Sequence, residues 1–159
     1  MPRRKTVIER RDIGVDPLYQ SELVQRLINV VMERGKKNTA RRIVYEALAV
    51  IAKKFGEGSK TLEAFQKSFD QVVPLVEVRS RRVGGSVYQI PTEVSFVRGR
   101  SLALRWLITG AASRSDKTMG LRLGYELLDA YEGRGGAIKK RLEVHKMAEA
   151  NRAFSHYSW

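Results

Sequence analysis

The chain has 159 residues, of which 43% are hydrophobic, and its 30 lysines and arginines against 17 acidic residues give a formal net charge of +13. This size predicts one domain over residues 1–159 with a real core, and the charge favours a polyanionic partner, most simply a nucleic acid. The chain contains no cysteine, which excludes disulfides and thiolate metal sites. It also lacks an apolar run of about 18 residues, a signal peptide and a lipidation pattern, so we expect a cytoplasmic protein with no membrane partner.

Residues 1–17 form a basic segment without a helical period, and Asp16-Pro17 closes it with a turn signal. We interpret this segment as a flexible arm that becomes ordered against its partner. A disordered tail kept for solubility is the alternative. Its basic side chains are Arg3, Arg4, Lys5, Arg10 and Arg11.

Two helices should follow the arm and form a helical hairpin. The first opens at Ser21 with an apolar stripe at helical spacing and ends by Gly35, and the second has Asn38 or Thr39 as its cap. Both apolar faces should pack against each other.

Lys36 and Lys37 lie between these helices, where the helix macrodipole disfavours cations. Their placement predicts an anion, such as one phosphate held by the lysines and by the free backbone N–H groups of the helix start. Two solvated lysines in a surface turn are the alternative.

A third helix over residues 59–73 should bury Phe65 and Phe69, and residues 75–91 then read as a β-hairpin. Gly84-Gly85 suits a two-residue turn, and Pro74 and Pro91 bracket the segment. A turn centred there sets three cross-strand pairs: Arg81 with Tyr88, Arg79 with Ile90, and Arg82 with Val87. Arginines then occupy both faces, so the ribbon has no dry side and projects about 20 to 25 Å from the helical body, at about 3.3 Å per residue. Such a ribbon suits a nucleic-acid groove, although a solvated edge hairpin is the alternative.

Three more helices complete the prediction. The fourth runs from Thr92 to Gly110, with Arg98 and Arg105 on one face and Trp106 in the core. Ser115-Asp116 caps the fifth, whose two apolar stripes imply burial on much of its circumference. The sixth, over residues 137–152, is basic and thinly buried. The tail, residues 153–159, is a contact peptide because three aromatic residues within seven make an unusual exposed patch.

The sequence does not favour an enzyme. Of the two histidines, His145 lies within the basic helix and His156 in the tail, and no glycine pattern follows a strand as a phosphate loop requires. His and carboxylate residues are not spaced for a metal site, and we expect no cofactor. A nuclease or RNA-modifying enzyme and a basic architectural or helix-turn-helix DNA-binding protein, with residues 39–52 as recognition helix, are the alternatives.

The whole chain resembles the bacterial form of the small-subunit ribosomal protein seven family. The resemblance rests on Ser21-x-Leu23, Leu27-Ile28, Gly35-Lys36-Lys37, Ile43-Val44, Ala47, Glu77-Val78-Arg79, Gly84-Gly85, Tyr88-Gln89-Ile90-Pro91, residues 103–107, Asp116-Lys117 and the end of the chain from Met147. Family members often carry arginines and a proline at the start of the fourth helix, where this chain has Ser95, Phe96 and Gly99.

The resemblance implies a helical body with one ribbon that binds the three-prime major domain of small-subunit ribosomal RNA early and nucleates assembly of the subunit head. It also implies that the ribbon lies near exit-site transfer RNA and messenger RNA, with small-subunit proteins nine and eleven as neighbours. The predicted RNA contacts are Arg3, Arg4, Lys5, Arg10, Arg11, Lys36, Lys37, Arg79, Arg81, Arg82, Tyr88, Arg98, Arg105, Lys117, Lys139, Lys140 and Arg141. The predicted transfer RNA or protein contacts are Arg81, Arg82, Val83, Gly84, Gly85, Phe154, His156, Tyr157 and Trp159.

Overall fold

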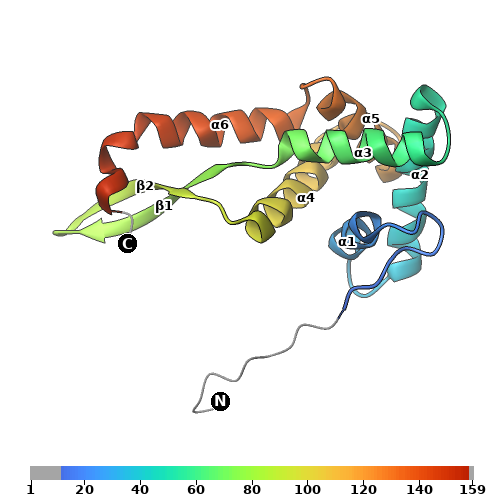
Figure 1. The fold of residues 1–159 in the computed structure, drawn as a ribbon, viewed down its shortest axis with the longest axis horizontal. Helices are drawn as coiled ribbons and strands as arrows, with labels where there is room; N and C mark the ends of the chain where they lie inside the picture. The colour runs from blue at the N-terminus through green and yellow to red at the C-terminus, as the bar shows by residue number, and fades with distance from the viewer. Residues whose placement is uncertain (1–11, 158–159) are drawn as a thin grey trace, which may run out of the picture.

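The computed structural model describes residues 12–157, in which six α-helices and one antiparallel hairpin form an elongated molecule (Figure 1). The elements are α1 (Glu22–Val31), α2 (Lys37–Phe55), α3 (Ser59–Val72), β1 (Val76–Val83), β2 (Ser86–Glu93), α4 (Phe96–Ala112), α5 (Met119–Tyr131), α6 (Gly136–Ala150) and the 3₁₀ turn η1 (Arg152–Tyr157). The predicted mainly helical class, with the ribbon between the third and fourth helices, is confirmed.

The first two helices begin differently. Ser21 caps α1, where its Oγ accepts a hydrogen bond from the N–H of Val24 at 3.5 Å. In α2 neither Asn38 nor Thr39 is the cap, because the helix already begins at Lys37 and its N-cap, Lys36, makes no side-chain hydrogen bond. The amino end of α2 therefore has no side-chain cap.

Helix α5 lies at the centre of the body and packs against α2, α3, α4 and α6. Leu123 and Leu127 are fully buried, and a Cβ placed on Gly124 would come within 2.8 Å of the Cβ of Val50 on α2. This glycine therefore allows the two helices to approach closely. The predicted burial on much of the circumference is confirmed, except that Tyr125 is 40% exposed.

The ribbon has the predicted register. Arg81 pairs with Tyr88, Arg79 with Ile90 and Arg82 with Val87, around the positive-φ turn at Gly84 and Gly85. Two-residue turns require such φ angles, which glycine adopts without strain.

The predicted end of the ribbon and start of α4 are wrong. Pro91 lies inside β2 opposite Val78, the ribbon extends to Glu93, and α4 begins at Phe96 rather than at Thr92. Proline is tolerated because each strand of a two-stranded ribbon has an outer edge that needs no ladder hydrogen bonds.

The ribbon also has a dry side near its base, contrary to the prediction. Ile90 is fully buried and Glu77 is 7% exposed, because α6 and η1 pack along the ribbon (Figure 1). A lone two-stranded hairpin is marginally stable in water, and this lateral support explains how a long ribbon persists.

The end of the described chain is helical rather than irregular. After α6, the turn η1 folds against β2, and the ring centroid of Phe154 lies 5.0 Å from that of Tyr88. No helix within residues 12–157 combines the length and apolarity needed to cross a membrane.

Candidate RNA-binding surface

Several predicted contact residues lie outside the part of the chain that the structure describes. These are Arg3, Arg4, Lys5, Arg10, Arg11 and Trp159, and the side chains of Val83 and Tyr157 are also not described. The flexible arm therefore stays a prediction.

The tip of the ribbon carries two arginines that are available for a ligand. Arg82 is exposed and Arg81 is partly exposed, and within residues 12–157 neither side chain forms an ion pair. Gly84 and Gly85 are exposed at the turn beside them. The tip therefore presents cationic side chains and accessible backbone together.

At the base of the ribbon, two predicted contact residues are already engaged by a carboxylate. Glu77 Oε2 lies 2.7 Å from Arg98 Nε of α4, and Glu77 Oε1 lies 2.6 Å from an Nη of Arg79. Burial alone would raise the pKa of the Glu77 carboxyl, but the hydrogen bonds from Arg98 and Arg79 outweigh it, so its pKa lies below the ordinary value. About half of each arginine side chain remains exposed to solvent, but the negative charge of Glu77 offsets part of their positive charge.

Tyr88 is not an open stacking surface. Its side chain is partly buried, and its ring is tilted by 50° against the ring of Phe154 in η1. His156, which also lies in η1, is exposed. Of the predicted tail contacts, Phe154 is thus joined to the ribbon, which the sequence did not predict.

The basic residues of α6 differ in their exposure and in their partners. Lys139 and Lys140 are exposed, with Lys140 Nζ 3.2 Å from Glu143 Oε2, while Arg141 donates a hydrogen bond to the backbone carbonyl of Gln71 at the end of α3. Arg141 therefore helps to hold α6 on the body.

Two cations from different helices meet at a hollow of about 420 Å³. Arg105 of α4 and Lys140 of α6 both line it, together with Trp106, which is partly buried. Lys117 is exposed in the loop before α5. The sequence spacing predicted that Arg105 shares a helix face with Arg98, but it did not predict that Arg105 and Lys140 of α6 line the same hollow.

Helix α2, whose start carries Lys36 and Lys37, lies at the other end of the molecule from the ribbon (Figure 1). Both are exposed at the uncapped start of α2, and neither α1 nor α2 contacts the ribbon in the described structure. The predicted cations therefore do not gather in one patch. They are distributed along the length of the molecule.

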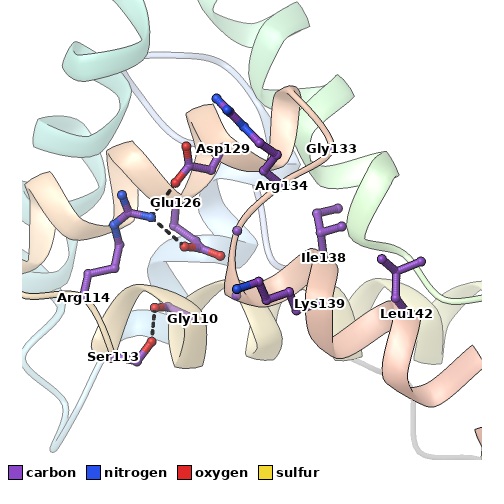
Figure 2. Close-up of a pocket in the computed structure, with 12 residues that line it drawn as sticks. Gly110, Ser113, Arg114, Glu126, Asp129, Gly133, Arg134, Ile138, Lys139 and Leu142 are labelled. Atoms are coloured by element: carbon purple, nitrogen blue, oxygen red, sulfur yellow. Dashed lines mark hydrogen bonds and ion pairs between the residues drawn. The ribbon is translucent and has the colours of Figure 1, made fainter. Parts of the chain in front are cut away.

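The junction of α4, α5 and α6 contains a charge cluster around one buried carboxylate, which sequence reasoning missed (Figure 2). Glu126, 1% exposed, accepts hydrogen bonds from the N–H of Ala137 at 2.8 Å and from Arg114 Nη1 at 3.0 Å. Arg114 also donates to Asp129 at 2.7 Å and to Asp116 at 3.2 Å. Burial alone would lower the pKa of Arg114, but the hydrogen bonds to these carboxylates outweigh that effect, so its pKa lies above the ordinary value.

This cluster lines a hollow of about 630 Å³, yet each of its carboxylates is already held by Arg114 or a backbone N–H. Through the hydrogen bond from Ala137, the cluster contacts the first turn of α6. The glycines of residues 133–136 marked the turn, but nothing in their spacing identified Glu126 or Arg114 as its anchor.

His145 of α6 joins that helix to the root of the ribbon. Its Nε2 accepts a hydrogen bond from the N–H of Leu75 at 3.3 Å, and burial together with the nearby Arg141 lowers its pKa. Among residues 12–157, no three His, Cys, Asp or Glu side chains are grouped so that they could hold a metal ion.

The helix that the DNA-binding alternative requires for recognition is packed into the core. On α2, Val44, Ala47 and Leu48 are fully buried against the rest of the body. A recognition helix must present side chains to base edges in a groove, so this burial leaves α2 only its polar flank.

A family model described as ribosomal protein S7p/S5e matches residues 2–152, which is nearly the entire chain. The chain belongs to this family. It is therefore a small-subunit ribosomal protein, part of a ribonucleoprotein that acts in translation, and it binds ribosomal RNA. The S7p/S5e family consists of structural proteins of the ribosome, and the distributed cations described above suit such a role.

Proposed function

We propose that this protein binds the three-prime major domain of small-subunit ribosomal RNA directly, and that early binding nucleates assembly of the subunit head. The observation that carries the proposal is the separation of exposed cations along one elongated body, with Lys36 and Lys37 at one end and Arg81 and Arg82 at the other. Cations so far apart reach different RNA helices, and a single protein that bridges helices stabilises their relative arrangement.

Recognition in this proposal depends on RNA shape. The deep, narrow major groove of A-form RNA hides its base edges, so proteins contact phosphates, 2′-hydroxyls and the wide minor groove. The described ribbon is narrow, and its tip has arginines and an exposed glycine turn that allow close approach to a backbone. The exposed Lys36 and Lys37 beside the uncapped start of α2 suit a phosphate at the far end of the body.

We further propose that the ribbon tip lies near exit-site transfer RNA and the messenger path. Arg81 and Arg82 support this part, since they form no ion pair within residues 12–157 and lie beside the turn. Small-subunit proteins nine and eleven are the proposed neighbours, with protein eleven beside the tail. The contact of η1 with β2 supports a shared surface of tail and ribbon.

The salt dependence of RNA binding tests the proposal. If about six to eight phosphates are neutralised, log affinity falls with log salt at a slope of about −0.7 to −0.9 per contact. Affinity for a transcript of the three-prime major domain should be measured from low to moderate salt, with duplex DNA of equal length as competitor and a nucleotide-resolution footprint on the transcript. A nearly flat salt response, or preference for the duplex, would overturn the proposal. Cleavage or a mass change of the RNA would favour an enzyme.

A further inference from the structure

A large aromatic ring stands open to solvent at the first residue of α4. Phe96 is 73% exposed, and Leu75 at the root of the ribbon is 74% exposed. Both side chains line one hollow of about 290 Å³, so they form a joint apolar surface rather than scattered single residues. Exposed apolar side chains that share one hollow are candidates for a contact site.

An arginine with an unused donor lies beside this ring. The guanidinium carbon of Arg100 is 5.2 Å from the ring centroid of Phe96 and 5.7 Å from that of Phe69, which is buried. Its Nε is buried and has no hydrogen-bond partner within the described chain. Arg100 is thus held by two aromatic rings rather than by a carboxylate, in contrast to Arg98, which pairs with Glu77.

Helix α3 provides a polar edge to the same hollow. Gln66 and Asp70 also line it, and Gln66 Nε2 donates to Asp70 Oδ1 at 2.8 Å. Asp70 is exposed, and among the described residues only Gln66 donates a hydrogen bond to its carboxylate, which has further lone pairs for N–H donors. The hollow therefore combines an apolar ring face with the guanidinium group of Arg100 and the carboxylate of Asp70.

We propose that this hollow, here called the Phe96 platform and formed by Leu75, Phe96, Arg100, Gln66 and Asp70, binds one unpaired purine base of the ribosomal RNA. The proposal rests on the proposed function and adds a base-binding site to its phosphate contacts. Unpaired RNA bases stack on aromatic rings and on arginine planes, and their edges form hydrogen bonds with nearby side chains. The platform offers all of these groups within one hollow.

The charges of the platform decide which part of the RNA it takes. A phosphate would be repelled by the Asp70 carboxylate, whereas a guanine has amino and imino donors for Asp70 and O6 and N7 acceptors for an arginine. The net charge of +13 and membership of an RNA-binding family favour RNA over a neighbouring protein as the occupant.

The test compares Phe96→Ala and Phe96→Tyr with the parent protein for binding to the transcript of the three-prime major domain. Loss of one stacked base should weaken affinity about 5- to 100-fold in Phe96→Ala, and Phe96→Tyr should restore most of it. Stacking releases no counterions, so the slope of log affinity against log salt should stay unchanged. In the footprint, one unpaired purine should become reactive while the other protections persist.

The matched control is Val97→Ala, because Val97 is the next residue, is 54% exposed and does not line the hollow. Its affinity should equal that of the parent, and thermal melts should show that all variants fold. If Phe96→Ala had the affinity and the footprint of the parent, the proposed base site would be overturned. Loss of a neighbouring protein from subunits that carry the variant would then indicate that the hollow binds a protein instead. Failure of the parent itself to bind the transcript would instead overturn the proposed function.

Discussion

Arg98 of α4 lies 2.7 Å from the carboxylate of Glu77 at the base of the ribbon, and this ion pair joins the ribbon to the helical body. Glu77 also binds Arg79 on its own strand, so one buried carboxylate holds a cation from each element. Part of the positive charge near the ribbon therefore serves the fold, while the arginines at the tip are left for a ligand.

Glu77→Gln should lower the free energy of unfolding by about 1 to 2 kcal/mol, since the two arginines it leaves are half exposed and can be solvated by water. The folded pKa of Glu77 is lowered from 4.5, so the parent protein has this stabilisation in full above about pH 4.5 and loses it as pH falls through the folded pKa. Chemical denaturation between pH 3 and pH 7 measures both effects.

Glu93→Gln is the control for Glu77→Gln, since Glu93 is exposed on the partner strand. It should leave the pH dependence of stability as in the parent. An unchanged acid sensitivity of Glu77→Gln would contradict the role assigned to its ion pairs.

The double variant Arg81→Ala/Arg82→Ala should weaken RNA binding without lowering the melting temperature. Neither arginine forms an ion pair in the described fold, so removal of both takes away ligand contacts alone. If each neutralises one phosphate, the salt slope should become shallower by about 1.4 to 1.8. Affinity measured against salt, beside a thermal melt, gives both results.

Lys53→Ala/Lys60→Ala is the matched control for the tip variant, because it also removes two exposed cations but lies at the end of α2 and the start of α3. Its salt slope should stay closer to that of the parent. If the tip variant melted earlier than this control, the tip arginines would be structural.

The register of the ribbon could be predicted because a two-residue turn at Gly84 and Gly85 fixes every cross-strand pair. The buried faces of α1, α2 and α3 followed from apolar spacing in the same way. Both are local properties, in which the chain itself sets the geometry.

The predictions that proved wrong, and the contacts that were missed, involve segments that are distant in the sequence. The dry face of the ribbon at Ile90 exists because α6 returns beside it, and no local pattern states where a helix some 50 residues later will run. The pairing of Glu77 with Arg98 likewise joins β1 to α4, two elements that are separated in the sequence by β2. Sequence alone therefore identified the cations of the candidate surface but not which of them the fold neutralises.

Phe154→Ala should loosen the ribbon without unfolding the body. The ring of Phe154 packs on Tyr88 of β2, and such an aromatic pair contributes about 0.5 to 1.5 kcal/mol beyond the burial of its area. Hydrogen exchange of β2 amides should become faster, while amides in the centre of α5 keep their protection. Ser155→Ala, on an exposed neighbour, is the control, and equal exchange in both variants would contradict a supporting role for η1.

Glu126→Gln should be the most destabilising of these changes, because Glu126 is buried on α5 and contacts both the start of α6 and Arg114 in the loop after α4. The amide can still accept from the N–H of Ala137, but its NH₂ group cannot replace the carboxylate that Arg114 contacts, so we expect a loss of about 2 to 4 kcal/mol by chemical denaturation. Gly110→Ala probes the same junction sterically, since its Cβ would lie 2.7 Å from Glu126 Oε1. Parent-like stability in both variants would mean that α6 is positioned by its apolar contacts, and that the charge cluster follows the fold without determining it.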